Sequence, residues 1–373
     1  MFITKKAKGI RLFNVSGAFF FIFVFSCLTP MKYGFQTVLF QVLLVIPFLL
    51  ISNVSILKRS ALTFLFLVSY LLVSSLFNQF WDFKLILSIA FILLISTNPS
   101  DFKGFLTPSF SAALYFIFII SILEKIYPSS LWYLLAENDA HLEMYKAGYA
   151  VYSTLGNSTH SAYITLLIGS YLLYVKKNIK YFFITLILLF IFSNKVCLGV
   201  FVTLYSLHLF FNSGLKNKLF VFLFFLIVFY AAWFFVFEKY YVSWTSTDID
   251  NIHTISHRVG LFEFTLDKII SVNFWLFGEP GFINDFGQAF DSGIILLMFR
   301  YGVLVTFFLY FIMYFKIASE YRMIYWTIVV PSITQVSFYN SQFMLLCSFI
   351  ILSLSSNRIV PYKVNGVDFL NEK

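Results

Sequence analysis

The sequence predicts an all-α polytopic membrane protein with about twelve transmembrane helices, and two observations carry this prediction. Hydrophobic residues make up 60% of the 373 residues and charged residues 12%, with a mean hydropathy of +0.86. That balance leaves too little polar surface for a soluble globular domain. Apolar runs of roughly 15–20 residues recur from end to end, close to the length that a helix needs to cross a bilayer. We therefore treat residues 1–373 as a single integral membrane domain.

The apolar runs define the expected spans in chain order. Four basic residues precede the first run and no small-residue cleavage site follows it, so we expect a retained helix and not a cleaved leader. The twelve expected spans are residues 13–29, 35–52, 60–77, 84–98, 107–127, 160–175, 180–193, 196–212, 219–237, 291–315, 323–339 and 342–356.

The distribution of basic residues predicts that both termini are cytoplasmic. With that orientation, seventeen of the 26 Lys and Arg residues fall in cytoplasmic segments and eight on the other side, while Arg300 lies inside a span. Short loops rich in Lys and Arg remain in the cytoplasm. The net charge of +9 is therefore a topology signal. It indicates contact with acidic membrane lipid and not binding of nucleic acid.

Two loops are long in this topology, residues 128–159 and 238–290, and both lie on the side away from the cytoplasm. A protein whose polar mass gathers on one face is expected to work on that face. The sequence contains no P-loop, so neither ATP nor another cofactor is expected. Cys27, Cys197 and Cys347 lie within apolar runs, which indicates neither a disulfide framework nor a cysteine metal site.

The second long loop contains the segment SHRVGLFEFTLDKII, whose pattern is typical of an amphipathic helix on the membrane surface. Ser256 is a suitable N-cap, which places Arg258 in the first turn, where backbone N–H groups and the helix dipole favour an anion. Arg258 is either a phosphate ligand or a solvated interfacial arginine. The two faces are formed by Phe262, Leu266 and Ile269 on the apolar side and by Glu263, Asp267 and Lys268 on the polar side.

A carboxylate and an arginine mark the span after this loop. Asp291 opens the helix and is a candidate general base, or else the cap of the helix that it begins. Arg300 lies nine residues later, on the opposite face of a straight helix and within the hydrocarbon, where a charge is functional by default. It either reaches a neighbouring helix, binds a lipid-linked phosphate, or pairs with a carboxylate such as Glu124, or Asp291 after a kink at Gly302.

Four further polar residues face the same side in this topology. Lys195, in the turn LFIFSNKVCLGVF, is a candidate anion ligand or a snorkelling lysine. His160, in LGNSTHSAY, is a candidate polar contact, although capping by Ser158 or Thr159 also accounts for the local pattern. His253 and His257 are four residues apart, but this spacing alone is a weak metal signal, and no metal site is predicted.

In order and on one membrane face, these features resemble the Wzy-type O-antigen polymerases and, more distantly, the O-antigen ligases. The resemblance lies in the two large outer loops and in five short segments: LGNSTHSAY, SNK, HRVGLFEF, LFGEPGF and DSGIILLMFRYG. Ligases of this superfamily have a catalytic histidine in the segment that matches FDSG, where this chain has Asp291. That departure favours a polymerase.

The resemblance implies a membrane glycosyltransferase of lipopolysaccharide biosynthesis, similar to the GT-C-type lipid-donor enzymes. It would transfer the growing glycan from undecaprenyl pyrophosphate onto a new lipid-linked repeat unit, on the periplasmic face of a bacterial inner membrane, with a chain-length regulator protein as a further expected partner. A lipid-linked oligosaccharide flippase or other transporter, and an O-antigen ligase, are the alternatives. The implied catalytic residues are Asp291, Arg258, Glu263 and His257, and the implied pyrophosphate- or substrate-binding residues are Lys195, Arg300 and His160.

Overall fold

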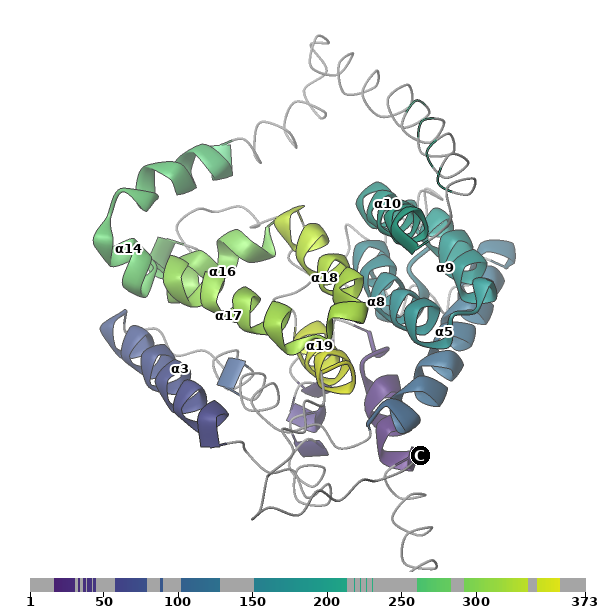
Figure 1. Cartoon of the computed structure of the whole chain (residues 1–373), viewed down its shortest axis with the longest axis horizontal. Helices are drawn as coiled ribbons and strands as arrows, with labels where there is room; N and C mark the ends of the chain where they lie inside the picture. The colour runs from purple at the N-terminus through teal and green to yellow at the C-terminus, as the bar shows by residue number, and fades with distance from the viewer. Residues whose placement is uncertain are drawn as a thin grey trace, which may run out of the picture.

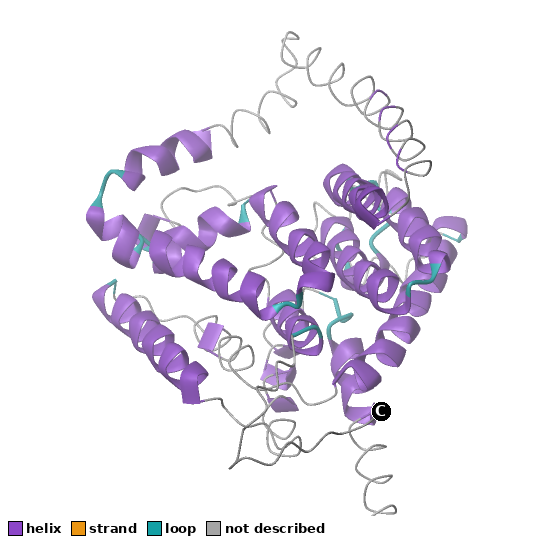
Figure 2. Ribbon diagram, in the orientation of Figure 1, coloured by secondary structure: helices purple, strands orange, loops and turns teal. Residues whose placement is uncertain are grey.

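The structure is a computed structural model that describes residues 17–30, 58–78, 102–127, 151–212, 260–282, 292–334 and 341–355, with isolated residues in 33–44, 88–89 and 218–230. All regular secondary structure in these ranges is helical (Figure 2), and their one β-type pairing is an isolated bridge between Ile317 and Ser355. The expectation of an all-α protein is therefore confirmed for this part of the chain.

Besides the helical residues Gly17–Ser26, seven helices coincide with expected apolar runs, and two short 3-10 helices lie in the connections. The seven are α3 (Lys58–Phe77), α5 (Phe102–Ile126), α8 (Ser158–Lys176), α9 (Ile179–Ile191), α10 (Lys195–Asn212), α18 (Arg322–Thr334) and α19 (Ser341–Ser353). The remaining elements are η2 (Ser153–Leu155), α14 (Val272–Phe277), α16 (Gly293–Tyr301), α17 (Val303–Lys316) and η4 (Ser319–Tyr321).

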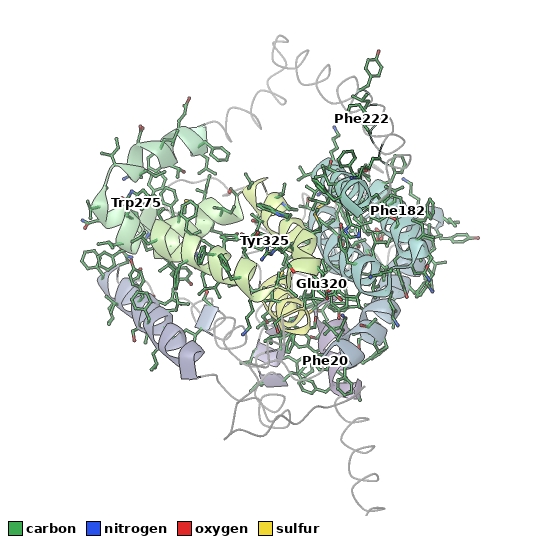
Figure 3. All side chains as sticks on the ribbon, in the orientation of Figure 1. Phe20, Phe182, Phe222, Trp275, Glu320 and Tyr325 are labelled. Carbon is green, nitrogen blue, oxygen red and sulfur yellow. The ribbon has the colours of Figure 1, made fainter. Side chains whose placement is uncertain are left out.

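Among the described residues, one helix is both long and apolar enough to cross a membrane by length and composition, namely Lys103–Ile126 in α5. Six shorter apolar helices accompany it: Gly17–Ser26, Leu65–Phe77, Ile179–Ile191, Lys195–Phe211, Val303–Lys316 and Phe343–Ser353. Large apolar side chains also project from the surface of several helices (Figure 3), among them Phe66, Phe190, Phe211, Phe222, Phe307, Phe311 and Phe315.

α8 is the centre of the packing and is buried along almost its whole length. It lies among α5, α9, α10 and α18 (Figure 1), and α18 and α19 join this group to α16 and α17. Gly169 permits the closest contact with α9, because a Cβ at this position would overlap the side chain of Thr185. Small residues of this kind let the backbones of apolar helices approach each other.

The helices run alternately between two ends of the bundle. At the end named here the Lys177 end, the start of α5 meets η4, where Lys103 Nζ donates to Tyr321 Oη at 2.6 Å. At the opposite end, named the Asn157 end, the starts of α8 and α19 meet, with the rings of His160 and Phe343 5.7 Å apart. An alternating course is what the expected series of spans requires.

The ends of α17 and α19 are also joined at the Lys177 end. The Ala318 N–H donates to the Leu354 carbonyl at 2.9 Å, beside the bridge between Ile317 and Ser355. These backbone contacts fix the turn that leads from α17 through η4 into α18.

The expected span 291–315 is not one straight helix. It is broken at Gly302, which has φ 91° and separates α16 from α17. A Cβ at Gly302 would lie 2.7 Å from the carbonyl oxygens of Trp275 and Leu276, because the end of α14 packs against the break. A residue without a side chain is therefore required here, and the expectation of a continuous helix was wrong.

Side chains of α3 bind the end of α14. The last carbonyls of a helix have no partner within it; here Ser74 Oγ and Asn78 Nδ2 both donate to the Phe277 carbonyl, at 2.9 and 2.8 Å, and Tyr70 Oη donates to the Leu276 carbonyl. The chain then turns at Gly278, whose φ is 72°.

The expected amphipathic helix is present as the helical residues 260–269. Leu261 and Thr265 face the protein and Ile269 packs partly against the core, while Phe262 and Leu266 are 43% and 63% exposed. Lys268 was expected on the polar face with Glu263 and Asp267. It turns inward instead, because it pairs with Glu279 at 2.8 Å and lies over the rings of Phe264 and Phe282.

Candidate functional site

His160 lies at the start of α8, on the side that faces α19. Its half-buried ring stands beside Phe343, and one turn further along α8 Tyr163 packs edge-on against the same phenylalanine. The cap of α8 is Asn157, whose Oδ1 accepts the N–H groups of Thr159 and His160 at 2.9 and 3.3 Å. Capping by Ser158 or Thr159 was therefore wrong, and the side chain of His160 is not used for the cap.

The start of α16 lies at the same end of the bundle. Ser292 caps this helix by accepting the Ile295 N–H at 3.3 Å, and its hydroxyl donates to the Ser332 carbonyl of α18 at 3.5 Å. The interpretation of Asp291 as the cap was therefore wrong, since its neighbour takes that place. Asp291 itself lies outside the described residues, as do Arg258 and His257.

α18 joins the helix of His160 to the helix that follows Asp291. Tyr163 Oη donates to the Ile328 carbonyl at 3.0 Å, and Ser292 binds Ser332 one helical turn further along. Tyr310 of α17 also bonds to the Ser332 hydroxyl at 3.1 Å. Segments far apart in the sequence thus meet within about one turn of α18.

Lys195 is the first residue of α10 and is exposed. Its helix is capped by Asn194, whose Oδ1 accepts the Cys197 N–H at 2.9 Å. α10 packs along α18, and because His208 near its end and Arg322 at the start of α18 line one cleft, the two helices are antiparallel. Lys195 therefore lies toward the Asn157 end, as His160 does.

Arg300 and Glu263 lie on two other elements. Arg300 is half-buried in the last turn of α16, about 12 Å along the helix from Ser292. The neighbouring Phe299 carbonyl accepts the Glu279 N–H at 2.6 Å, so this turn lies against the segment that follows α14. Glu263 is exposed on the helical residues 260–269.

Glu124 has a role other than the pairing with Arg300 that the sequence suggested. Its carboxylate is 2% exposed and accepts the N–H groups of Tyr152 and Ser153 at 2.8 and 2.7 Å, so the expected pairing with Arg300 was wrong. Ser161 Oγ donates to the Tyr152 carbonyl at 2.6 Å, which joins η2 to α8. The sequence feature that could have indicated this role is the position of Glu124, an acidic residue near the end of an apolar run.

The contact with Glu124 also affects the pKa of the Tyr152 hydroxyl. Its burial and the negative charge of the Glu124 carboxylate both raise the pKa of the Tyr152 hydroxyl, so it remains protonated at neutral pH. Glu124 thus positions the connection that leads into α8, and Ser161, the neighbour of His160, is bound to that connection.

The described residues form no group of three or more His, Cys, Asp or Glu side chains with metal-ligand geometry. What the arrangement offers is a histidine, a lysine and hydroxyl groups near one end of α18, and an arginine and carboxylate near the end of α14. Such groups can bind an anion and exchange a proton. No family model, curated protein or solved structure matches this chain.

Proposed function

We propose that the protein is a membrane glycosyltransferase that polymerises lipid-linked repeat units of a surface polysaccharide, as an O-antigen polymerase does. The observation that carries the proposal is the convergence of His160, Lys195 and Ser292, the neighbour of Asp291, toward one end of α18. These residues come from three of the segments on which the family resemblance rests.

The reaction has two substrates and therefore needs two binding places. His160 and Lys195 lie toward the Asn157 end of the bundle, whereas Glu263 lies on the helical residues 260–269 and Arg300 at the end of α16. Asp291 directly precedes the cap of α16. A base at that point would lie between a donor bound through its pyrophosphate and an acceptor bound through its sugars.

In the proposed step, the acceptor hydroxyl of a new repeat unit attacks the anomeric carbon at the reducing end of the growing glycan. Asp291 takes the hydroxyl proton, with Glu263 or His257 as the next candidates, while the bond between carbon and pyrophosphate oxygen breaks. Undecaprenyl pyrophosphate leaves with the electron pair. Arg258, Lys195 and Arg300 stabilise its negative charge, and His160 contributes a polar contact.

The apolar surface supports a location within a membrane. Large aromatic and aliphatic side chains are exposed on α3, α9 and α17, where a soluble protein would present charged groups. The alternating helix directions and the basic residues near the Lys177 end support an orientation with the Asn157 end facing the periplasm. The expected location is the bacterial inner membrane.

The test is the electrophoretic profile of surface lipopolysaccharide from cells that lack the gene, with and without the gene restored. Loss of a polymerase leaves core lipid with one repeat unit, whereas loss of a flippase leaves no repeat unit. Loss of a ligase leaves polymer on the lipid carrier. Either of the last two results contradicts the proposal.

Variants then test the roles of individual residues. Asp291→Ala and Arg258→Ala should abolish the polymer ladder at normal protein level, because removal of a general base or of a leaving-group cation costs roughly 10²–10⁴-fold in rate. Asp267→Asn and Lys125→Ala remove exposed charges of the same two types and should keep the ladder. A ladder that survives Asp291→Ala would contradict the assignment of the base.

A further inference from the structure

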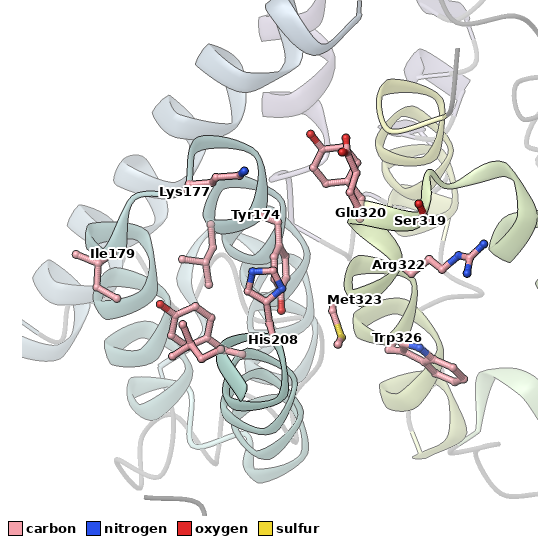
Figure 4. A pocket seen from close by; sticks show the side chains of 13 residues that line it. Tyr174, Lys177, Ile179, His208, Ser319, Glu320, Arg322, Met323 and Trp326 are labelled. Carbon is pink, nitrogen blue, oxygen red and sulfur yellow. The ribbon is translucent and has the colours of Figure 1, made fainter. Parts of the chain in front are cut away.

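A cleft of about 630 Å³ opens at the Lys177 end of the bundle, opposite the proposed catalytic end. One wall is built by α8, α9 and α10, and the other by η4 and the start of α18 (Figure 4). The proposed reaction uses none of these residues.

The two walls carry opposite charges. Lys177 follows α8 in a left-handed conformation, with φ 52°, and its N–H is bound to the Leu173 carbonyl, so its position is fixed. Glu320 lies on the facing wall, in η4. Within the described residues, Lys177 and Glu320 form no ion pair with each other or with another residue, so both charges remain available to a ligand.

A histidine lies deeper in the same cleft. The half-buried imidazole of His208 packs edge-on against Tyr174, with ring centroids 4.8 Å apart. Arg322 contributes less than its charge implies, because its guanidinium runs away from the cleft and lies 4.7 Å from the centre of the Tyr314 ring. Lys177 is therefore the cation of the cleft, and His208 is a hydrogen-bonding group on the same side.

An apolar track leaves the cleft along α9. Ile179 lines the cleft and is 51% exposed, and the exposed Phe183, Ile187 and Phe190 continue on the same helical face. The track is about 16 Å long at 1.5 Å per residue, which is about half of the ~30 Å hydrocarbon core and therefore the depth of one leaflet.

We propose that this cleft binds a zwitterionic phospholipid whose head group carries both a phosphate and an amine. The phosphate binds Lys177 and His208, the ammonium group binds Glu320 on the opposite wall, and an acyl chain lies along the track on α9. A cation facing a carboxylate favours this head group over one that is only anionic, because Glu320 repels a second negative charge. The inference rests on the membrane location in the proposed function but not on the reaction.

The test is native mass spectrometry of the purified full-length protein titrated with phosphatidylethanolamine, phosphatidylglycerol or phosphatidylcholine in detergent. We expect phosphatidylethanolamine to bind more tightly than phosphatidylglycerol. Lys177→Ala should weaken both by about fivefold, whereas Glu320→Gln should weaken phosphatidylethanolamine by a similar factor and leave phosphatidylglycerol unchanged or tighter. Phosphatidylcholine retains the positive charge but its head group donates no hydrogen bond. Its affinity should therefore lie between those of phosphatidylethanolamine and phosphatidylglycerol.

Two variants control for loss of charge elsewhere. Lys176→Ala removes the adjacent exposed lysine, which does not line the cleft, and Asp267→Asn removes a distant exposed carboxylate; neither should change phospholipid binding. Soluble O-phosphoethanolamine distinguishes a site for the free head group from a site that also needs the acyl chain, and we expect it not to compete.

Equal binding of the two phospholipids by the wild type, or the same response of both to Glu320→Gln, would overturn the proposal. Because the assay contains no glycan substrate, its outcome is independent of polymerase activity. A loss of lipid binding and a loss of the polymer ladder are thus separate results.

Discussion

Two irregular connections of this protein are held in opposite ways. η2 is held by one buried charge, the carboxylate of Glu124, which accepts two backbone N–H groups. The turn after α14 is held by neutral donors, Ser74 of α3 and Asn78 directly after it, which share the single carbonyl of Phe277. Both arrangements satisfy backbone groups that their helices or turns leave without partners.

The difference shows which substitution should destabilise each connection. The two N–H groups of η2 depend on one side chain, so removing that side chain leaves both buried donors without an acceptor. The Phe277 carbonyl has two donors, so loss of either leaves one in place. The second connection instead depends on Gly278 and Gly302, where backbone meets backbone and no side chain fits.

The largest expected effect is that of Gly302→Ala. The new Cβ would stand 2.7 Å from two carbonyl oxygens at a residue with φ 91°, which should cost about 3 kcal/mol or more. Thermal unfolding of the detergent-purified protein measures the change. Gly199→Ala is the matched control, because a Cβ there meets nothing within 4 Å, and it should be neutral or slightly stabilising within α10. Equal melting temperatures for the two variants would show that the close approach at Gly302 is not formed.

Glu124→Ala should come next, at about 2–4 kcal/mol, because it strands two buried N–H groups. It should also lower the polymer yield, since η2 leads into the helix of His160. The exposed Asp267→Ala serves as the control in the same unfolding assay. A neutral Glu124→Ala would remove the contrast between the two connections.

Ser74→Ala and Asn78→Ala should each cost about 0.5–1 kcal/mol, since the other donor still binds the Phe277 carbonyl. The double variant leaves that carbonyl without either donor and should cost more than the sum of the single changes. A double-mutant cycle measures this coupling. Additive effects would mean that the two donors act independently.

The smallest expected effect belongs to the pair of Lys268 and Glu279. Their side chains are 31% and 45% exposed, and an ion pair so open to solvent contributes about 0.5 kcal/mol at most. The coupling from a double-mutant cycle should fall further in high salt because the charges are screened. A coupling above about 1 kcal/mol, or one that salt does not weaken, would show that the pair is better shielded than its exposure indicates.

The helices could be predicted from the sequence because their ends are marked locally. Asn157 and Asn178 stand directly before α8 and α9 and cap them with their own side chains, and the apolar runs that follow set the lengths. The break at Gly302 could not be predicted in this way. A glycine in an apolar run is compatible with a helix, and only the distant carbonyls of α14 require that position to be a glycine.

The placement of two candidate residues toward one end of the bundle was predictable for a similar reason, and their role stays a prediction. His160 and Lys195 follow recognisable turns, and a topology with alternating spans places them at one end of the protein. The role of Glu124 was not predictable, because its partners Tyr152 and Ser153 lie 28 and 29 residues away and offer only backbone groups. A sequence pattern carries no information about which backbone N–H groups a carboxylate will meet.

The hydrogen bond between the Ala318 N–H and the Leu354 carbonyl also determines when this end of the bundle can form during synthesis of the chain. The turn from α17 into α18 receives its backbone partner from the end of α19, and η4 receives the side chain of Lys103 from α5. The ribosome makes α5 early and α19 last. The contacts of the Lys177 end therefore cannot be completed until α19 has been made, and a chain stopped after α18 would leave the Ala318 N–H without its Leu354 partner.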